Sequence, residues 1–123
     1  MSDLTHEECE LLVRTALRVL SNWQVGDEDG RRILGDVDKA TYADWHSGNF
    51  RDLPTATMAR CAILIGIHKG LRLMFPEPAR GYAWMSRANE ILAGATPIET
   101  IRTGNLHALR RLRDYVAAQS QLW

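Results

Sequence analysis

The histidines and cysteines are the side chains here that most readily hold a metal or attack a substrate. They are His6, His46, His68, His107, Cys9 and Cys61. A structural zinc site needs about four ligands at short, characteristic separations, and these residues lack such spacing. Ser, His and Asp occur without the pattern of a catalytic triad, and there is no glycine-rich phosphate loop and no nucleophile elbow. We therefore expect a protein that is not an enzyme and binds no metal and no cofactor.

These side chains are instead expected to serve the core. His68 lies on a largely apolar stretch, which favours a hydrogen-bonded core histidine. Cys9 and Cys61 lie far apart in helical patterns, which favours reduced thiols over a disulfide and suits a cytoplasmic protein. Three Glu within the first ten residues are not typical of a signal peptide. The most apolar run, residues 62–67, is far too short to span a bilayer, so no membrane association is expected.

Charge is divided unevenly along a neutral chain. The 123 residues carry no net charge, so the chain as a whole lacks a nucleic-acid signature. Residues 26–51 hold four Lys/Arg against six Asp/Glu, whereas residues 80–123 hold six against three. The basic end is therefore the C-terminal one.

Helical periodicity runs through the whole chain and predicts an all-α fold. A capping box starts the first helix at Thr5, its wide apolar stripe includes Leu11, and Gly26 ends it. Two short helices are expected over residues 27–34 and 38–46, and Asp38 is the expected N-cap of the second. A long helix should then run from about residue 55 to 75.

Pro76–Pro78 is the expected boundary between two parts. The N-terminal part, residues 1–75, is helical and helix-turn-helix-like, and the C-terminal part covers residues 79–123. In the C-terminal part we expect one helix over 79–92, a short helix opened by a second capping box at Thr96, and a last helix. The last helix should bury a stripe formed by Leu106, Leu109, Leu112 and Val116.

Small residues four apart mark one face of the long helix. They are Ala62, Gly66 and Gly70, and they allow a neighbouring helix to approach closely. That neighbour could belong to the same chain or to a second copy, so self-association through the helical N-terminal part is expected.

Residues 31–50 have the pattern of a small helix-turn-helix. The second helix of such a motif lies in the major groove, and its first residues meet bases or phosphates. Those positions are Lys39, Thr41 and Tyr42, which are the expected DNA contacts, while Leu34 and Trp45 should face the core.

The acidic character of this segment opposes DNA binding. Asp36, Asp38 and Asp44 each repel phosphates, and the turn is one residue longer than the common phage-repressor-like pattern. Two interpretations stay open, namely an operator-binding motif and a trihelical scaffold with a solvated acidic surface.

The second half carries a series of residues in a specific order. They are Trp84-Met85, Asn89, Leu92, Gly94, Pro97, Glu99 and Thr103-Gly104. In this series the chain resembles the C-terminal toxin-binding domain of the Xre/MbcA/ParS-like antitoxins. Residues 31–48 loosely resemble the helix-turn-helix-like N-terminal part of the same family.

The resemblance implies a function that composition does not indicate. Such antitoxins pair with a RES-domain toxin, which degrades NAD or transfers ADP-ribose from it to a protein. The C-terminal part covers or enters the NAD pocket, and many members also repress their own operon. The resemblance therefore implies a cytoplasmic hetero-oligomer with a RES-domain toxin.

The expected toxin-binding residues lie in the C-terminal part. They are Trp84, Asn89, Arg102, Thr103, Gly104, Arg110, Gln119, Ser120, Gln121, Leu122 and Trp123. Several have an alternative role: Trp84 in core packing, the Thr-Gly-Asn segment as a plain turn, and Trp123 as a frayed end. Arg110, Arg111 and Arg113 either pair with toxin carboxylates or form a solvated face.

The function has an alternative from another class. A helix-turn-helix transcriptional repressor that autoregulates its operon would use the C-terminal half for dimerisation. A structural adaptor for some other partner is the third hypothesis. A RES-domain protein encoded beside this chain would favour the antitoxin.

Overall fold

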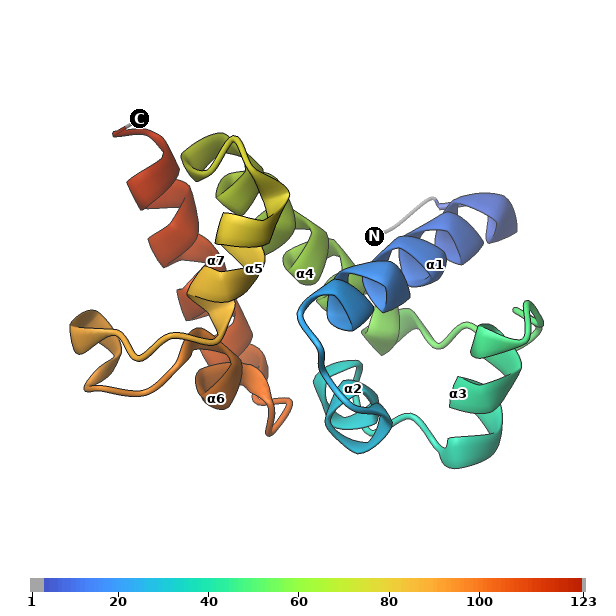
Figure 1. Ribbon diagram of the computed structural model, residues 1–123. Helices are drawn as coiled ribbons and strands as arrows, with labels where there is room; N and C mark the ends of the chain where they lie inside the picture. The colour runs from blue at the N-terminus through green and yellow to red at the C-terminus, as the bar shows by residue number, and fades with distance from the viewer. Residues whose placement is uncertain (1–3, 123) are drawn as a thin grey trace.

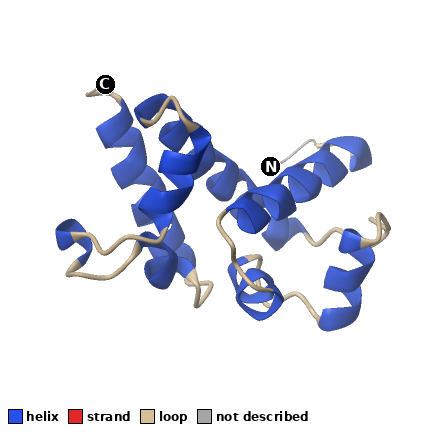
Figure 2. Ribbon diagram, in the orientation of Figure 1, coloured by secondary structure: helices blue, strands red, loops and turns tan. Residues whose placement is uncertain are grey.

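Helices make up every regular element of the computed structural model, which describes residues 4–122 (Figures 1 and 2). The elements are α1 His6–Asn22, α2 Asp27–Ile33, α3 Lys39–His46, α4 Thr55–Met74, α5 Pro78–Met85, the 3-10 turn η1 Glu90–Leu92, α6 Pro97–Ile101 and α7 Leu106–Ser120. No strand occurs within residues 4–122, and the predicted all-α fold is confirmed.

The long helix α4 is the element on which both halves of the chain pack. In Figure 1, α1 to α3 lie on one side of the molecule and α5 to α7 on the other, and α4 runs between them. Its most extensive contacts are with α7, followed by those with α1. Buried side chains form one cluster that extends from Val13 in α1 through Leu64 in α4 to Val116 in α7. The proposed parts 1–75 and 79–123 therefore share one hydrophobic core.

Helix starts follow the predicted capping chemistry. The Thr5 hydroxyl accepts the Glu8 backbone N–H, and the Glu8 carboxylate accepts the Thr5 N–H, which completes a capping box. Thr96 and Glu99 repeat this arrangement at the start of α6. The Thr96 backbone N–H group stabilises the Glu99 carboxylate and so lowers its pKa. These local hydrogen bonds set the start of each helix independently of the core.

The small-residue face of α4 packs inside the chain. A Cβ atom added to Gly70 would meet a methyl group of Val116 in α7, and one added to Gly66 would lie 3.5 Å from the Arg113 side chain. Ala62 lies outside this contact and is exposed. Glycine thus serves the α4–α7 contact of a single chain, and this face does not require a second copy.

The predicted helix over 79–92 is wrong, because the structure divides it. Helix α5 ends at Met85, and an irregular link leads to η1. The Asn89 side chain accepts the Ile91 N–H, and its backbone N–H donates to the Ala95 carbonyl oxygen. Asn89 therefore offers the backbone local hydrogen bonds that compete with a continuous helix.

Two expectations for the first helix are also wrong. Leu11 is 63% exposed, so the buried stripe is narrower than predicted. The helix ends at Asn22 and not at Gly26, because Gln24 takes a left-handed conformation with φ of 60°. Gly26 instead precedes α2 as its N-cap.

Candidate functional site

The helix-turn-helix-like segment is built around a sharp turn between α2 and α3. Gly35 and Asp36 both have positive φ, at 102° and 56°, and reverse the chain. The Thr57 hydroxyl of α4 donates to the Leu34 carbonyl oxygen, which fixes the turn on the core. Leu34 and Trp45 are 0% and 2% exposed, as predicted. This part of the chain therefore has a defined core contact on its inner side.

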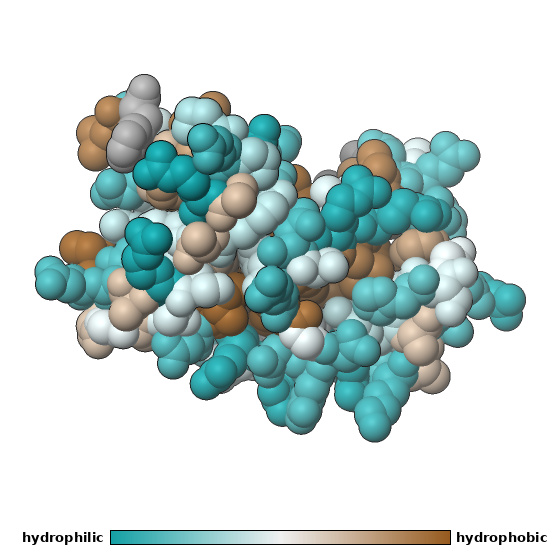
Figure 3. Space-filling view, in the orientation of Figure 1, coloured by the Kyte–Doolittle hydropathy of each residue, from teal (hydrophilic) through white to brown (hydrophobic). Residues whose placement is uncertain are grey.

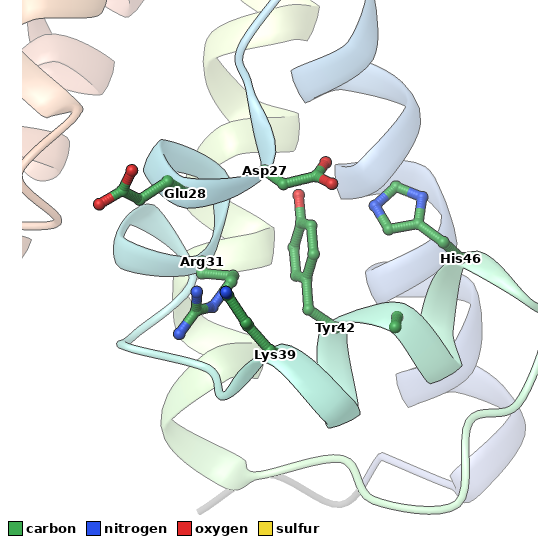
Figure 4. A pocket seen from close by; sticks show the side chains of 7 residues that line it. Asp27, Glu28, Arg31, Lys39, Tyr42 and His46 are labelled. Atoms are coloured by element: carbon green, nitrogen blue, oxygen red, sulfur yellow. The ribbon is translucent and has the colours of Figure 1, made fainter.

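A cavity of about 700 Å³ opens between α2 and α3 (Figure 4). Asp27, Glu28, Arg31, Lys39, Tyr42, Ala43 and His46 line it. Two carboxylates balance two cations in this lining, and a polyanion gains little from such a mixture. In Figure 4 the Tyr42 hydroxyl points toward Asp27, away from the exposed side of α3.

The expected DNA contacts are not equally accessible. Tyr42 is 4% exposed, and burial raises its pKa to about 12, so it is a neutral core residue. The expectation that Tyr42 contacts DNA does not fit this position, because its ring packs against Trp45 and His46. Lys39 is exposed, and Thr41 is half-buried, with its backbone N–H bound to the Asp38 side chain.

In the C-terminal part, Trp84 stacks on Tyr115. Their ring centroids lie 6.3 Å apart with planes at 12°, and both side chains are half-buried. Trp84 thus joins α5 to α7 and keeps part of its ring accessible. The stack on Tyr115 agrees with a role of Trp84 in packing, and the accessible part of its ring leaves room for a role in an interface.

Asn89 organises the loop that carries η1. Besides its bonds to Ile91 and Ala95, its backbone carbonyl oxygen accepts the Gly94 N–H. Ala93 and Gly94 both have positive φ, at 58° and 85°. The amide of Asn89 is therefore engaged within the loop, and the loop displays its neighbour Ile91, which is 69% exposed.

The Thr103-Gly104 turn docks the C-terminal part onto the N-terminal part. A Cβ atom on Gly104 would collide with the Arg32 backbone, and the Gly104 carbonyl oxygen accepts a hydrogen bond from Arg60. Thr103 and Arg102 are exposed beside it. Gly104 therefore has an internal structural role, whereas its two neighbours are available at the surface.

A second hollow of about 430 Å³ lies between the η1 loop and α7. Ile91, Leu92, Ala93, Thr100, Ala108, Arg111, Leu112 and Tyr115 line it. Arg110 lies exposed beyond this lining, and Arg113 is half-buried, where it pairs with Asp114 at 3.2 Å. The three arginines of α7 thus have different surroundings, and Arg111 is the one at the hollow.

The expected C-terminal contacts follow the end of α7. Gln119 and Ser120 are half-buried in its last turn, and the Ser120 hydroxyl donates to the Ala117 carbonyl oxygen. Gln121 is exposed, and Leu122 is 79% exposed. Trp123 lies outside the described residues.

Sequence reasoning missed two residues that matter in these sites. Arg60 joins the two parts, but an arginine in a helix has no signature that predicts such a contact. Ile91 falls within the helix predicted over residues 79–92. Its place between Asn89 and Gly94, two residues that favour turns, is the sequence pattern that indicates a loop there.

Within residues 4–122, no cluster of three or more His, Cys, Asp or Glu side chains could hold a metal ion. No helix in that range has the length and apolar character needed to cross a membrane.

Comparison with known proteins identifies the C-terminal segment. Residues 70–120 match the family model described as the antitoxin Xre/MbcA/ParS C-terminal toxin-binding domain. The chain is 28% identical over 102 residues to the uncharacterized protein y4oB of Sinorhizobium fredii, an alignment that covers 83% of this chain and 78% of the relative. No solved structure matches the chain.

Proposed function

We propose that residues 70–120, which match the antitoxin toxin-binding family model, are the toxin-binding part of an antitoxin. We further propose that this chain neutralises a RES-domain toxin that consumes NAD or uses it to ADP-ribosylate a protein. Neutralisation occurs because the C-terminal part covers the NAD pocket of the toxin. The protein itself is a binding protein with no catalytic role.

The family match over residues 70–120 is the observation that carries this proposal. The matched segment starts in the last turn of α4 and includes α5, α6 and α7. It therefore contains the glycine contact of α4 with α7, the Trp84 stack and the η1 loop. The matched residues are a complete helical unit, resting on the rest of α4.

An exposed apolar group just after α7 suits a pocket that binds a dinucleotide. A pocket for a pyrophosphate offers electropositive groups and an apolar slot. Leu122 is 79% exposed at the end of α7, next to the chain terminus. An exposed apolar side chain at this position suits the apolar slot of such a pocket.

NAD consumption tests the proposal. A RES-domain toxin would be purified and its NAD turnover followed with increasing amounts of this chain. We expect turnover to stop near a fixed molar ratio and the two proteins to co-elute in size-exclusion chromatography. Unchanged NAD turnover together with separate elution would contradict the proposal.

Operator binding by α2 and α3 is the second candidate function. It is favoured by one observation, the sharp turn that places a capped α3 with Lys39 exposed at its start. Binding should weaken with added salt because each phosphate contact releases counterions. We expect Lys39→Ala to weaken binding to all sequences and Thr41→Ala to alter sequence preference, as measured by mobility shift. Absence of a shift with the upstream promoter, alone or with the toxin, would exclude this function.

A further inference from the structure

The hollow between the η1 loop and α7 combines an apolar floor with one cation. Leu112 is 2% exposed at its base, and the Tyr115 ring forms a wall. Arg111 is exposed and is the only charged side chain among the described residues that line it. No ion pair of Arg111 occurs among residues 4–122, so its charge is available to a partner.

The chain holds an apolar side chain at the edge of this hollow. Ile91 is 69% exposed and is one of the residues that line the hollow. In Figure 3 an apolar spot stands at the left edge of the molecule, where Figure 1 places the 3-10 turn. Exposure of this kind beside a hollow is typical of a protein–protein contact.

The backbone of the η1 loop fixes Ile91 in that position. Four hydrogen bonds of Asn89, with residues 91, 92, 94 and 95, close the loop. Ala93 takes a left-handed conformation with φ of 58° that is unfavourable for a residue with a Cβ atom. The loop therefore keeps one conformation in spite of this strain. A fixed exposed anchor loses little conformational entropy on binding, which favours affinity.

We propose that this hollow, lined by Ile91, Leu112, Tyr115 and Arg111, is the docking site for a segment of the toxin that presents a large apolar side chain next to a carboxylate. The apolar side chain packs between Ile91 and Tyr115 over Leu112, and the carboxylate pairs with Arg111, whose guanidinium forms two bonds at once. This inference rests on the proposed function and adds the chemistry of the partner's segment. Charge complementarity selects this occupant, because an unpaired cation on an apolar hollow favours an acidic neighbour over a basic one.

Affinity for the purified RES-domain toxin used in the NAD assay tests the inference. Full-length antitoxin variants would be compared by biolayer interferometry, with Ile91→Asp and Arg111→Glu as the test substitutions. We expect each to lower affinity about tenfold or more, because one removes the apolar anchor and the other reverses the charge. Arg111→Gln should also flatten the dependence of affinity on salt.

Matched controls exist on other surfaces. Leu11 in α1 is 63% exposed, lies outside residues 70–120 and lines none of the hollows described above, so Leu11→Asp should change affinity by less than about threefold. Arg18→Glu in α1 is the control for charge reversal at an exposed helical arginine. Circular dichroism melting curves would show that each variant folds, as expected for exposed positions.

The outcomes separate this inference from the function on which it rests. If wild-type antitoxin binds the toxin and both Ile91→Asp and Arg111→Glu bind equally well, the docking site is wrong and the function stands. If the wild type fails to bind, the proposed function fails, and the inference fails with it. If Ile91→Asp changes only the mass measured by light scattering, the hollow serves a second copy of this chain, which also overturns the inference.

Discussion

Arg60 of α4 donates from one guanidinium nitrogen to the carbonyl oxygen of Gly104, at 2.5 Å, and to that of Ile33, at 3.2 Å. The first acceptor lies in the turn before α7, and the second lies at the end of α2. A charged donor strengthens both hydrogen bonds, and the side chain is half-buried, which limits competition from water. One arginine therefore ties the N-terminal part of the chain to the C-terminal part.

Substitution of Gly104 by alanine should weaken the contact between these two parts. The added Cβ atom would collide with the Arg32 backbone, and φ of 81° is unfavourable for alanine. We expect Gly104→Ala to lower the free energy of unfolding by about 2–4 kcal/mol, as measured by urea denaturation.

Gly94→Ala is the matched control for this prediction. Gly94 has a similar φ of 85°, but nothing lies within 4 Å of an added Cβ atom. Gly94→Ala should therefore lower the free energy of unfolding only by the cost of a left-handed backbone conformation at alanine, about 1–2 kcal/mol. Equal losses for the two variants would show that the contact with Arg32 contributes nothing.

The contact of α4 with α7 gives a second prediction. Gly70→Ala places a methyl group against Val116, whose β-branched side chain has little freedom to rotate away. We expect a loss of about 1–3 kcal/mol in the free energy of unfolding. Gly66→Ala should instead gain up to about 1 kcal/mol, because its Cβ atom makes only an ordinary contact with Arg113 and alanine favours a helix. Equal effects in chemical denaturation would contradict this model of the α4–α7 contact.

Features fixed by local chemistry were predicted well from the sequence. The capping boxes at Thr5 and Thr96 and the Asp38 cap are confirmed, because a hydroxyl or carboxylate satisfies backbone N–H groups within three residues. Of the stripe predicted for the last helix, Leu109, Leu112 and Val116 are buried and Leu106 is half-buried, since helical spacing places all four on one face.

Features that depend on distant partners were not predictable in the same way. Periodicity suggested a continuous helix over residues 79–92, but the hydrogen bonds of Asn89 with residues 91, 94 and 95 form a loop. The small-residue face of α4 was recognised, but only the fold shows that α7 of the same chain covers it. The contact of Arg60 with Gly104 joins residues 44 positions apart and leaves no local pattern.

Stability should respond to the protonation of His68. Burial, assisted by the charge of Arg72, holds the pKa of His68 below its ordinary value of 6.5. The unfolded chain therefore binds the proton first as pH falls, so the stability present above pH 6.5 decreases as pH drops through that value. We expect the melting temperature to fall between about pH 7.5 and pH 5.5, and His68→Gln to reduce that fall. His107→Gln controls for loss of a histidine, and an unchanged pH dependence in His68→Gln would refute the assignment.

A deletion at the end of α7 should weaken neutralisation of the toxin without unfolding the chain. Deletion of residues 119–123 leaves Leu109, Leu112 and Val116 in the core, so the fold should be retained. It removes Leu122, which is 79% exposed and gains nothing from its position in the free chain, together with Trp123. We expect inhibition of NAD consumption to weaken by about 2–4 kcal/mol, because a buried aromatic anchor typically contributes that much at an interface. The complex should still form, because most of the proposed toxin-binding part, residues 70–118, remains. If the truncated chain inhibits as well as the intact one, inhibition must come from the surface around Asn89, Arg102 and Arg110.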